Sequence, residues 1–257
     1  MSAPVCIITC QTLPVVDWQP AGGPIQAGPA VWRLAVPASD ELLAEAQGLF
    51  TAGERDRADR FRQAADRRRF LLGRLLARSL AGAYTGQPAV TVELVTGPQG
   101  KPDLNPALGW HLNLSHAGNW VVLALDRQPL GIDVEWCRPD LPLDLMVNSS
   151  LHPAEQAVVA RSSDPSGQFY TYWTRKEAFV KATGQGLPDT FHEISVLDGV
   201  NLAPAALLTL GQNWLVRSFT VEPGYPAALA TSTDTATPAF LTISPTDLMH
   251  SVSRAMP

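Results

Sequence analysis

The sequence has few cysteines and no long apolar run, and both shortages exclude classes of protein. Its 257 residues include three cysteines, Cys6, Cys10 and Cys137, which cannot form a disulfide framework. The Cys-x3-Cys spacing of the first two lacks a second half that would complete a tetrahedral metal site. No apolar run approaches the ~18 residues that cross a bilayer, and no positively charged leader is present. We therefore expect reduced thiols, a cytoplasmic location and no membrane association.

Charged residues are also scarce, at 17% of the chain against about 25% in ordinary globular proteins. This shortage argues against a coiled coil, whereas the hydrophobic fraction of 46% is enough for one large core or two small ones. The 22 prolines and 19 glycines favour many turns and short elements over a long helical bundle. The length predicts between one and two domains.

Lysine is the rarest charged residue, because 16 of the 19 basic residues are arginine. Lysine differs from arginine in having a compact ammonium group that can donate a proton. The three lysines, Lys101, Lys176 and Lys181, are therefore candidates for chemistry that arginine cannot perform.

The net charge of -5 argues against a general nucleic-acid binder, but the charge is unevenly distributed. Residues 54–78 contain nine arginines and four acids. A basic island in an acidic protein fits a small anion better than a polymer. The alternative interpretation is an arginine-rich, solvated helix face.

Apolar patterning predicts strands and helices in both halves of the chain, and hence an α+β or α/β fold. We expect helices at 40–49, 64–84, 153–161 and 168–183, and strands at 5–9, 31–36, 90–95, 111–115, 120–125, 130–135, 194–197, 214–222 and 227–231. The strands at 120–125 and 130–135 are expected to pair as a hairpin through the turn at 126–129. This pattern predicts an N-terminal subdomain over residues 1–125, a C-terminal subdomain over 126–257 and a partly loose tail from Thr231.

Two acidic residues alternate with apolar ones in the segment Gly131-Ile132-Asp133-Val134-Glu135. On a strand, Asp133 and Glu135 share one face and lie about 6.5 to 7 Å apart, facing a solvent-filled cleft. Two carboxylates at this spacing can share a hard cation, with Mg²⁺ preferred and Mn²⁺ as the alternative. An edge strand with ordinary acidic residues is the competing interpretation.

The predicted helix after Gln168 adds charged residues to this set. Trp173, Glu177 and Lys181 follow i, i+4, i+8 spacing, so Glu177 and Lys181 project side by side. The functional interpretation is a third metal ligand beside a cation that meets a phosphate. Lys176 is expected among apolar residues on the adjacent, inward face of the helix.

The strand at 111–115 ends in Ser115 and His116, which can donate hydrogen bonds to phosphate oxygens. Neighbours on a strand point apart, and no Gly-x-Ser-x-Gly elbow surrounds Ser115, so a hydrolase dyad is disfavoured. Carboxylates, a lysine, a Ser-His pair and an arginine island together indicate a ligand with several phosphates and a phosphoryl-type transfer.

These motifs resemble those of the 4′-phosphopantetheinyl transferases of the monomeric, surfactin-synthetase-activating type. The resemblance covers most of residues 50–190, in the family's order and spacing, and rests on the following segments: Asp66-Arg-Arg-Arg69-x-Leu-Leu-Gly73, Gly100-Lys101-Pro102, Asn113-Leu114-Ser115-His116, Gly131-Ile132-Asp133-Val134-Glu135 and Phe169-Tyr-x-x-Trp173-x-x-Lys176-Glu177-Ala-Phe-x-Lys181-x-x-Gly184-x-Gly186.

The resemblance implies two similar α/β subdomains related by a pseudo-twofold axis, with coenzyme A bound in the cleft between them. The enzyme would transfer the phosphopantetheine arm of coenzyme A to a serine of an apo acyl or peptidyl carrier protein and release 3′,5′-ADP. Fatty-acid, polyketide and peptide synthesis all remain open as the pathway. The implied enzyme is a monomer that needs Mg²⁺ and neither nucleic acid nor membrane.

The resemblance also implies roles for individual residues. Asp133, Glu135 and Glu177 correspond to the Mg²⁺ ligands, and Lys181 to the residue that neutralises or protonates the leaving phosphate. Glu177 is the expected base, so Glu177, Lys181 and Asp133 form the catalytic set. Coenzyme A contacts correspond to Arg69, Lys101, Ser115, His116, Lys176 and Lys181, with Arg57 as a further candidate for the 3′-phosphate.

Two positions depart from the family pattern: Glu54 replaces a frequent lysine, and Phe70 replaces a frequent threonine. The contacts of the 3′-phosphate therefore fall on Arg57, Arg69 and His116. The competing functions are a non-catalytic relative that binds coenzyme A or carrier proteins, and a different metal-dependent phosphotransferase or hydrolase. The presence of all three acids argues against the non-catalytic relative.

Overall fold

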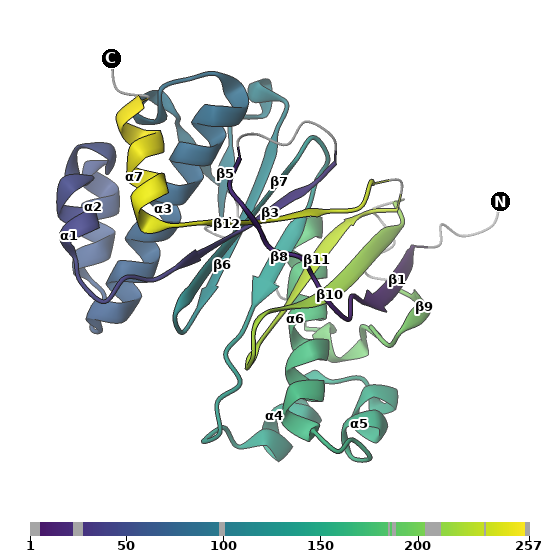
Figure 1. Ribbon diagram of the computed structural model, residues 1–257. Helices are drawn as coiled ribbons and strands as arrows, with labels where there is room; N and C mark the ends of the chain where they lie inside the picture. The colour runs from purple at the N-terminus through teal and green to yellow at the C-terminus, as the bar shows by residue number, and fades with distance from the viewer. Residues whose placement is uncertain are drawn as a thin grey trace. The chain divides into compact units, whose positions relative to one another are not determined.

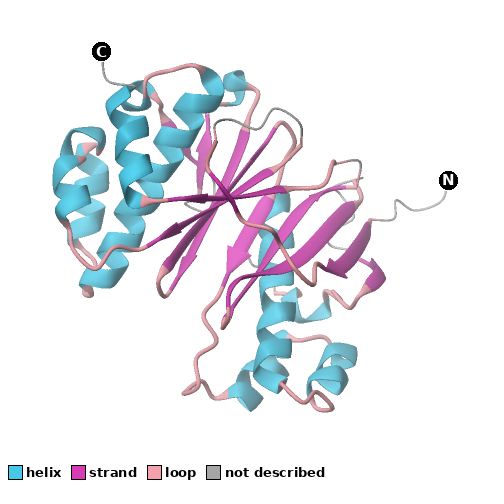
Figure 2. Cartoon of the chain, viewed as in Figure 1, coloured by secondary structure: helices cyan, strands magenta, loops and turns pink. Residues whose placement is uncertain are grey.

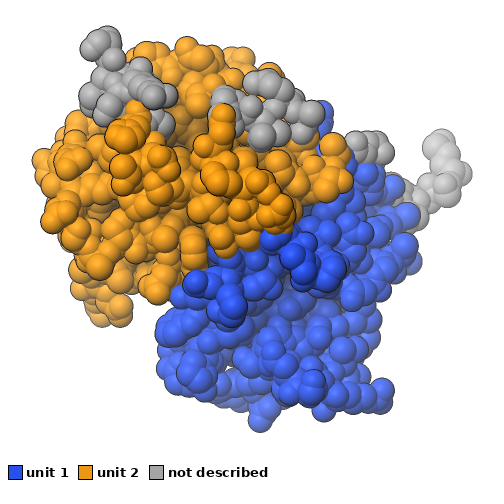
Figure 3. All heavy atoms as spheres, viewed as in Figure 1, with its two compact units in different colours: residues 1–16, 128–235 blue, residues 17–127, 236–257 orange. Residues whose placement is uncertain are grey.

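The chain folds into two compact units, coloured separately in Figure 3. The computed structural model describes residues 6–22, 28–97, 101–184, 186, 189–203, 212–233 and 235–254. Unit 1 comprises residues 1–16 and 128–235, and unit 2 comprises residues 17–127 and 236–257. The units therefore differ from the predicted halves at both ends of the chain. Residues 1–16 belong to the unit built mainly by the C-terminal half, and residues 236–257 belong to the unit built mainly by the N-terminal half.

Unit 2 contains a five-stranded sheet with the order β2-β12-β3-β7-β6 (Figure 1). β3 pairs antiparallel with β7, β7 pairs antiparallel with β6, and β12 runs parallel to β3. The strands are β2 (Gln19–Pro20), β3 (Ala30–Ala35), β6 (His111–Ala117), β7 (Trp120–Asp126) and β12 (Ala239–Ile243). A separate two-stranded sheet joins β4 (Leu94–Thr96) and β5 (Pro102–Leu104).

The long helix α3 (Ala64–Thr85) packs against β6 and β7 of unit 2. Its predicted apolar face is buried, with Leu72, Leu76 and Leu80 all in the core of this unit. α3 ends at Gly86, whose φ of 70° is a left-handed conformation that glycine adopts without strain. The other helices of this unit are α1 (Glu41–Glu45), α2 (Ala52–Asp59) and α7 (Pro245–Arg254).

Unit 1 contains a second five-stranded sheet, with the order β8-β11-β10-β1-β9. Its strands are β1 (Ile7–Thr12), β8 (Gly131–Val134), β9 (Gly199–Leu202), β10 (Trp214–Glu222) and β11 (Tyr225–Ser232). The long helix α6 (Pro165–Thr183) packs against β8, β10 and β11, next to the shorter helices α4 (Leu143–Ser150) and α5 (Pro153–Val159). Helices and strands are coloured separately in Figure 2.

The two units share one strand arrangement. In unit 2, β7 follows β3 and β6 in the sequence but lies between them, and in unit 1, β11 lies between β8 and β10 in the same way. All of these pairings are antiparallel. In unit 2, α3 follows β3 and precedes β6 and β7 along the chain. In unit 1, α6 likewise follows β8 and precedes β10 and β11. The expected mixed α/β fold with two similar subdomains is therefore observed.

Several local predictions were wrong. The predicted hairpin across 126–129 does not form, because β7 belongs to the sheet of unit 2 and β8 to the sheet of unit 1. A 3₁₀ helix at 89–91 overlaps the start of the predicted strand at 90–95, and the segment 194–197 has no strand. The tail from Thr231, which was predicted to be partly loose, contains β12 and α7. Among the described helices, none is both long and apolar enough to cross a membrane.

Candidate functional site

A close crossing of β8 and α6 positions Asp133 in unit 1. A Cβ atom on Gly131 would lie 2.1 Å from the Ala178 carbonyl oxygen and 2.4 Å from the Ala182 nitrogen, so this approach requires glycine. Asp133 follows Gly131 by two residues, so its side chain lies on the same face of β8, toward α6. Asp133 is only 3% exposed. The prediction that Asp133 faces solvent was therefore wrong, because α6 covers it.

Lys181 lies at the buried carboxylate. Its Nζ atom is 2.6 Å from Oδ1 of Asp133 and donates a second, longer hydrogen bond of 3.4 Å to the Ile132 carbonyl oxygen. The Lys181 side chain is 25% exposed and that of Asp133 is 4% exposed. The ion pair therefore has a buried acidic end and a basic end that reaches solvent.

Glu135 lies just beyond the end of β8 and is held at two points. Its backbone nitrogen donates to the Pro226 carbonyl oxygen at 3.0 Å, and Nε1 of Trp173 donates to its Oε1 at 3.2 Å. The pKa of Glu135 is raised to about 7, first by burial and then by repulsion from Asp133, although Trp173 and Lys181 oppose this rise.

Glu177 is half-buried on α6, one helical turn before Lys181. Burial, and then repulsion from Asp133, raise the pKa of Glu177 to about 7, while Lys181 acts in the opposite direction. Asp133, Glu135, Glu177 and Lys181 thus form one electrostatically coupled group. The sequence analysis grouped these four residues. In the structure, Asp133 lies on β8, Glu135 directly follows this strand, and Glu177 and Lys181 lie on α6.

The three carboxylates supply only oxygen donors, which are the ligands that Mg²⁺ and Mn²⁺ prefer. Burial, and then repulsion from Asp133, raise the pKa of Glu135 and that of Glu177, and a bound divalent cation would relieve the repulsion. The donor set therefore fits such an ion. In the described ranges, however, no three His, Cys, Asp or Glu side chains are already grouped as a metal site.

A second group of candidate residues lies in unit 2, at the end of the β6–β7 hairpin. Ser115 is buried and His116 is exposed on β6, as expected for neighbours on one strand. Nη1 of Arg69 donates to the Gly118 carbonyl oxygen at 2.7 Å, and Arg69 also pairs with Asp66. The arginine from α3 is therefore held at the turn that follows His116.

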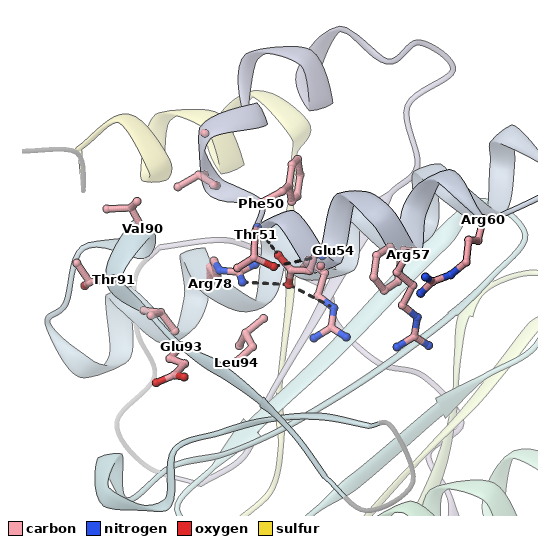
Figure 4. A pocket seen from close by; sticks show the side chains of 16 residues that line it. Phe50, Thr51, Glu54, Arg57, Arg60, Arg78, Val90, Thr91, Glu93 and Leu94 are labelled. Atoms are coloured by element: carbon pink, nitrogen blue, oxygen red, sulfur yellow. Dashed lines mark hydrogen bonds and ion pairs between the residues drawn. The ribbon is translucent and has the colours of Figure 1, made fainter.

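The arginine island forms a cavity of about 570 Å³ between α2, α3 and the segment 90–94 (Figure 4). Arg57 and Arg60 are exposed, whereas Arg74 and Arg78 are buried. Oε1 of Glu54 lies 3.0 Å from Nη2 of Arg78 and 3.7 Å from Nε of Arg74. The solvated-face interpretation is therefore wrong for the last two arginines.

Glu54 and Phe70, the two residues that depart from the family pattern, line this cavity. Glu54 closes a capping box with Thr51 at the start of α2 while it pairs with the buried arginines. Phe70 is 8% exposed, and the guanidinium carbons of Arg57 and Arg74 lie 5.1 and 5.2 Å from its ring centre. Glu54 and Phe70 thus hold arginine side chains in place.

Lys101 and Lys176 differ in their surroundings. Lys101 is half-buried just before β5, and its neighbour Gly100 is outside the described residues. Lys176 is fully buried, with Nζ 2.9 Å from Oε2 of Glu155 and 2.9 Å from the Ser150 carbonyl oxygen. This enclosure of the ammonium group within unit 1 argues against the predicted coenzyme A contact of Lys176, which remains a prediction.

Sequence reasoning missed the hydrogen bonds of two residues on α6, of which Trp173 contacts the carboxylate group. Trp173 was identified on the line of Glu177 and Lys181, but its hydrogen bond to Glu135 was not. Arg175 is 1% exposed and donates to the Val196 carbonyl oxygen at 2.7 Å and to Asp198 at 2.6 Å. The helical spacing could have indicated Trp173, whereas nothing in the local sequence indicates the partners of Arg175.

Comparisons with known proteins cover both units. A family model described as "4′-phosphopantetheinyl transferase superfamily" matches residues 129–230, and one described as "4′-phosphopantetheinyl transferase, N-terminal" matches residues 33–128. The two models meet between residues 128 and 129, one residue from the change between unit 2 and unit 1.

Individual relatives agree with the family models. The protein named 4′-phosphopantetheinyl transferase psf-1 of Bacillus pumilus is 32% identical over 182 residues, which are 69% of this chain and 77% of the relative. The transferase named HetI of a Nostoc species is 33% identical over 163 residues, or 61% of this chain and 69% of the relative. The transferase named Sfp of Bacillus subtilis is 29% identical over 195 residues, or 75% and 87%.

Proposed function

The chain belongs to the 4′-phosphopantetheinyl transferase superfamily, and from this membership we propose how its own residues carry out the reaction. It is an enzyme that transfers the phosphopantetheine arm of coenzyme A to apo carrier proteins. The observation that carries the assignment is the match of both family models across residues 33–230. The non-catalytic alternative is not favoured, since the relatives are named as transferases.

Asp133, Glu135 and Glu177 are the proposed ligands of a Mg²⁺ ion, with Mn²⁺ as a substitute. When bound, the ion would neutralise negative charge on the diphosphate of coenzyme A. The support is their shared electrostatic environment, in which burial and mutual repulsion raise the pKa of two of the three carboxyls. These carboxyls would release protons when the cation binds.

Residues of unit 2 are the proposed contacts of the nucleotide part of coenzyme A. They are Arg57, Arg69, Lys101, Ser115 and His116. Arg69 is held at the turn after His116, and Arg57 lines the arginine cavity. Guanidinium groups form strong, charge-assisted hydrogen bonds with phosphate oxygens. We assign the 3′-phosphate to Arg57, Arg69 and His116.

The proposed reaction forms a bond between the carrier serine oxygen and the β-phosphorus of coenzyme A. The bond from this phosphorus to the bridging oxygen breaks, and 3′,5′-ADP leaves with the electron pair. The serine proton passes to Glu177, directly or through a water molecule. Burial and then repulsion from Asp133 raise the pKa of Glu177 to about 7 in the metal-free chain, and a bound cation would lower it and leave the carboxylate ionised and able to accept the proton. Lys181 neutralises or protonates the leaving phosphate.

The test is to incubate the protein with coenzyme A, Mg²⁺ and a panel of apo acyl and peptidyl carrier proteins and to weigh the carriers by mass spectrometry. We expect one carrier or more to gain the mass of phosphopantetheine, and a chelator to abolish the gain. A panel on which no carrier gains mass would favour the non-catalytic reading. Light scattering on the same preparation tests the proposal that the enzyme is a monomer.

A further inference from the structure

Trp173 is the donor that fixes the orientation of one proposed metal ligand. Its indole nitrogen donates to Oε1 of Glu135 at 3.2 Å. Among the described residues, no other side chain donates a hydrogen bond to Glu135. The backbone of Glu135 is fixed as well, through its bond to the Pro226 carbonyl oxygen. With both the main chain and one carboxylate oxygen held, Oε2 remains for a cation.

The indole ring itself is held by packing. Trp173 is half-buried on α6, with its ring centre 6.1 Å from that of Phe169 and 5.4 Å from that of Phe191. The first ring comes from one turn earlier on the helix, and the second from the 3₁₀ helix at 191–193. Aromatic contacts on two sides restrict the ring, so its N–H group is aimed before any ligand arrives.

One face of α6 thus contacts the carboxylate on β8 and the one that directly follows it. Lys181 pairs with Asp133 and Trp173 donates to Glu135, while Glu177 lies between these two residues on the same helical line. The two donors differ in charge. Lysine cancels the charge of its partner, whereas indole is a neutral donor with no acceptor atom. The hydrogen bond therefore orients Glu135 without adding a positive charge beside it.

We propose that Trp173 is a positioning residue whose indole N–H orients Glu135 for divalent-cation binding. The inference rests on the metal role assigned to Glu135 under the proposed function. Partners that orient metal ligands typically contribute about 10- to 100-fold to metal affinity when they are removed. We therefore expect Trp173→Phe, which keeps an aromatic ring and removes the N–H, to weaken cation binding by about this factor.

A matched control is available in the same unit. Trp214 is 2% exposed and packs against Phe179 with ring centres 6.2 Å apart. Among the described residues, its Nε1 atom has no hydrogen-bond partner. Trp214→Phe therefore makes the same chemical change without removing a hydrogen bond. It should leave cation affinity within about twofold of the unaltered protein, since no oriented ligand depends on it.

The experiment titrates the full-length protein with Mn²⁺ alone and follows free Mn²⁺ by electron paramagnetic resonance. Thermal unfolding of the metal-free proteins is recorded alongside. Because Trp173→Phe also changes packing, a second variant replaces Trp173 by 3-benzothienylalanine, which keeps the ring shape and puts sulfur in place of N–H. A 10- to 100-fold loss in both Trp173 variants, but not in Trp214→Phe, supports the inference.

Three results would overturn it. They are an unchanged affinity in Trp173→Phe, a normal affinity in the benzothienyl variant, and an equal loss in Trp214→Phe. Glu135→Gln and Glu177→Gln separate this failure from that of the proposed function. If these two variants lose Mn²⁺ while Trp173→Phe keeps it, only the role of Trp173 is wrong. If neither loses Mn²⁺, the metal assignment fails together with this inference.

Discussion

The two units have the same strand arrangement and opposite chemical character. Each has three antiparallel strands, and the strand that comes last in the sequence lies between the other two. Each also has a long helix packed on its sheet. In unit 2 the helical layer carries the arginine cavity, whereas in unit 1 the strand-helix crossing carries coupled carboxylates. One scaffold can therefore serve an anion in one copy and a cation in the other, because function depends on the side chains placed on a fold.

The largest effect is expected from removing a charge in unit 1. Asp133→Asn should lower turnover by about a thousandfold, because the proposed cation site would lose a charged ligand. Asparagine is nearly isosteric, so the buried crossing of β8 and α6 should survive. Initial rates over a Mg²⁺ series test this, with the exposed Asp140→Asn as the control in the same unit. Rates near wild type in both Asp133→Asn and Glu135→Gln at limiting Mg²⁺ would refute the metal assignment.

Lys176 should affect stability and not substrate binding. Lys176→Met leaves Glu155 buried without its ion-pair partner, which costs about 3 kcal/mol of unfolding free energy. Urea unfolding measures this loss, and the double variant with Glu155→Gln should recover part of it. Coenzyme A affinity of the folded variant should stay within about twofold, since the ammonium group does not reach a ligand. A parallel loss of affinity would return Lys176 to the binding site.

Glu177 tests whether the coupled carboxylates have separate roles. Glu177→Gln should reduce turnover by about a hundredfold, as expected for loss of a general base, and impair coenzyme A binding far less. Both quantities are to be measured on one preparation. If affinity for coenzyme A falls together with turnover, Glu177 is mainly a metal and substrate ligand, and the proposed base must be another group.

Exchanging one cation for another should distinguish the units. Lys181→Arg keeps the charge but replaces a compact proton donor, so turnover should fall by about tenfold. Arg69→Lys, the reverse exchange in unit 2, should mainly raise the KM for coenzyme A, because lysine cannot form the bidentate phosphate contact that arginine can. Steady-state kinetics of both variants test this contrast. A Lys181→Arg enzyme that matches wild type would reduce the lysine to a simple charge.

The smallest effect concerns pH. The pKa of Glu135 and that of Glu177 are about 7 in the folded chain, above the ordinary value of 4.5, so folding favours their protonated forms. This contribution to stability is fully present below about pH 4.5 and is lost as pH rises through about 7. We expect the metal-free unfolding temperature to fall by a few degrees from pH 5.5 to 8, and less in the Glu135→Gln/Glu177→Gln variant. Equal profiles would contradict this assignment.

The sequence predicted the long helices and the carboxylate group because their signals are local. Leu72, Leu76 and Leu80 repeat at helical spacing, and a short motif contains Asp133 and Glu135. Partners far apart in sequence could not be found in this way. Lys176 pairs with a glutamate 21 residues earlier, and Asp126 to Pro129 has the composition of a tight turn although the chain there passes from one sheet to the other.

The strand exchange at the chain ends was beyond local prediction for the same reason. β1 pairs with β10 and β12 with β3, and each pairing joins segments about 200 residues apart. Nothing in either segment's composition specifies such a partner. The register is decided by which sheet edge can bury the strand's apolar side chains, and this depends on the completed core.

The exchanged strands also set the order in which the protein can be completed as it is synthesised. β3 leaves the ribosome early, but its parallel neighbour β12 is made only when residues 239–243 have been added. β1 is made before its neighbour β10 and must wait for it. Until β12 has been synthesised, β3 has an open edge that could pair with other chains. A nascent or prematurely terminated chain is therefore a substrate for chaperones and proteases, even though most of unit 2 has already been translated.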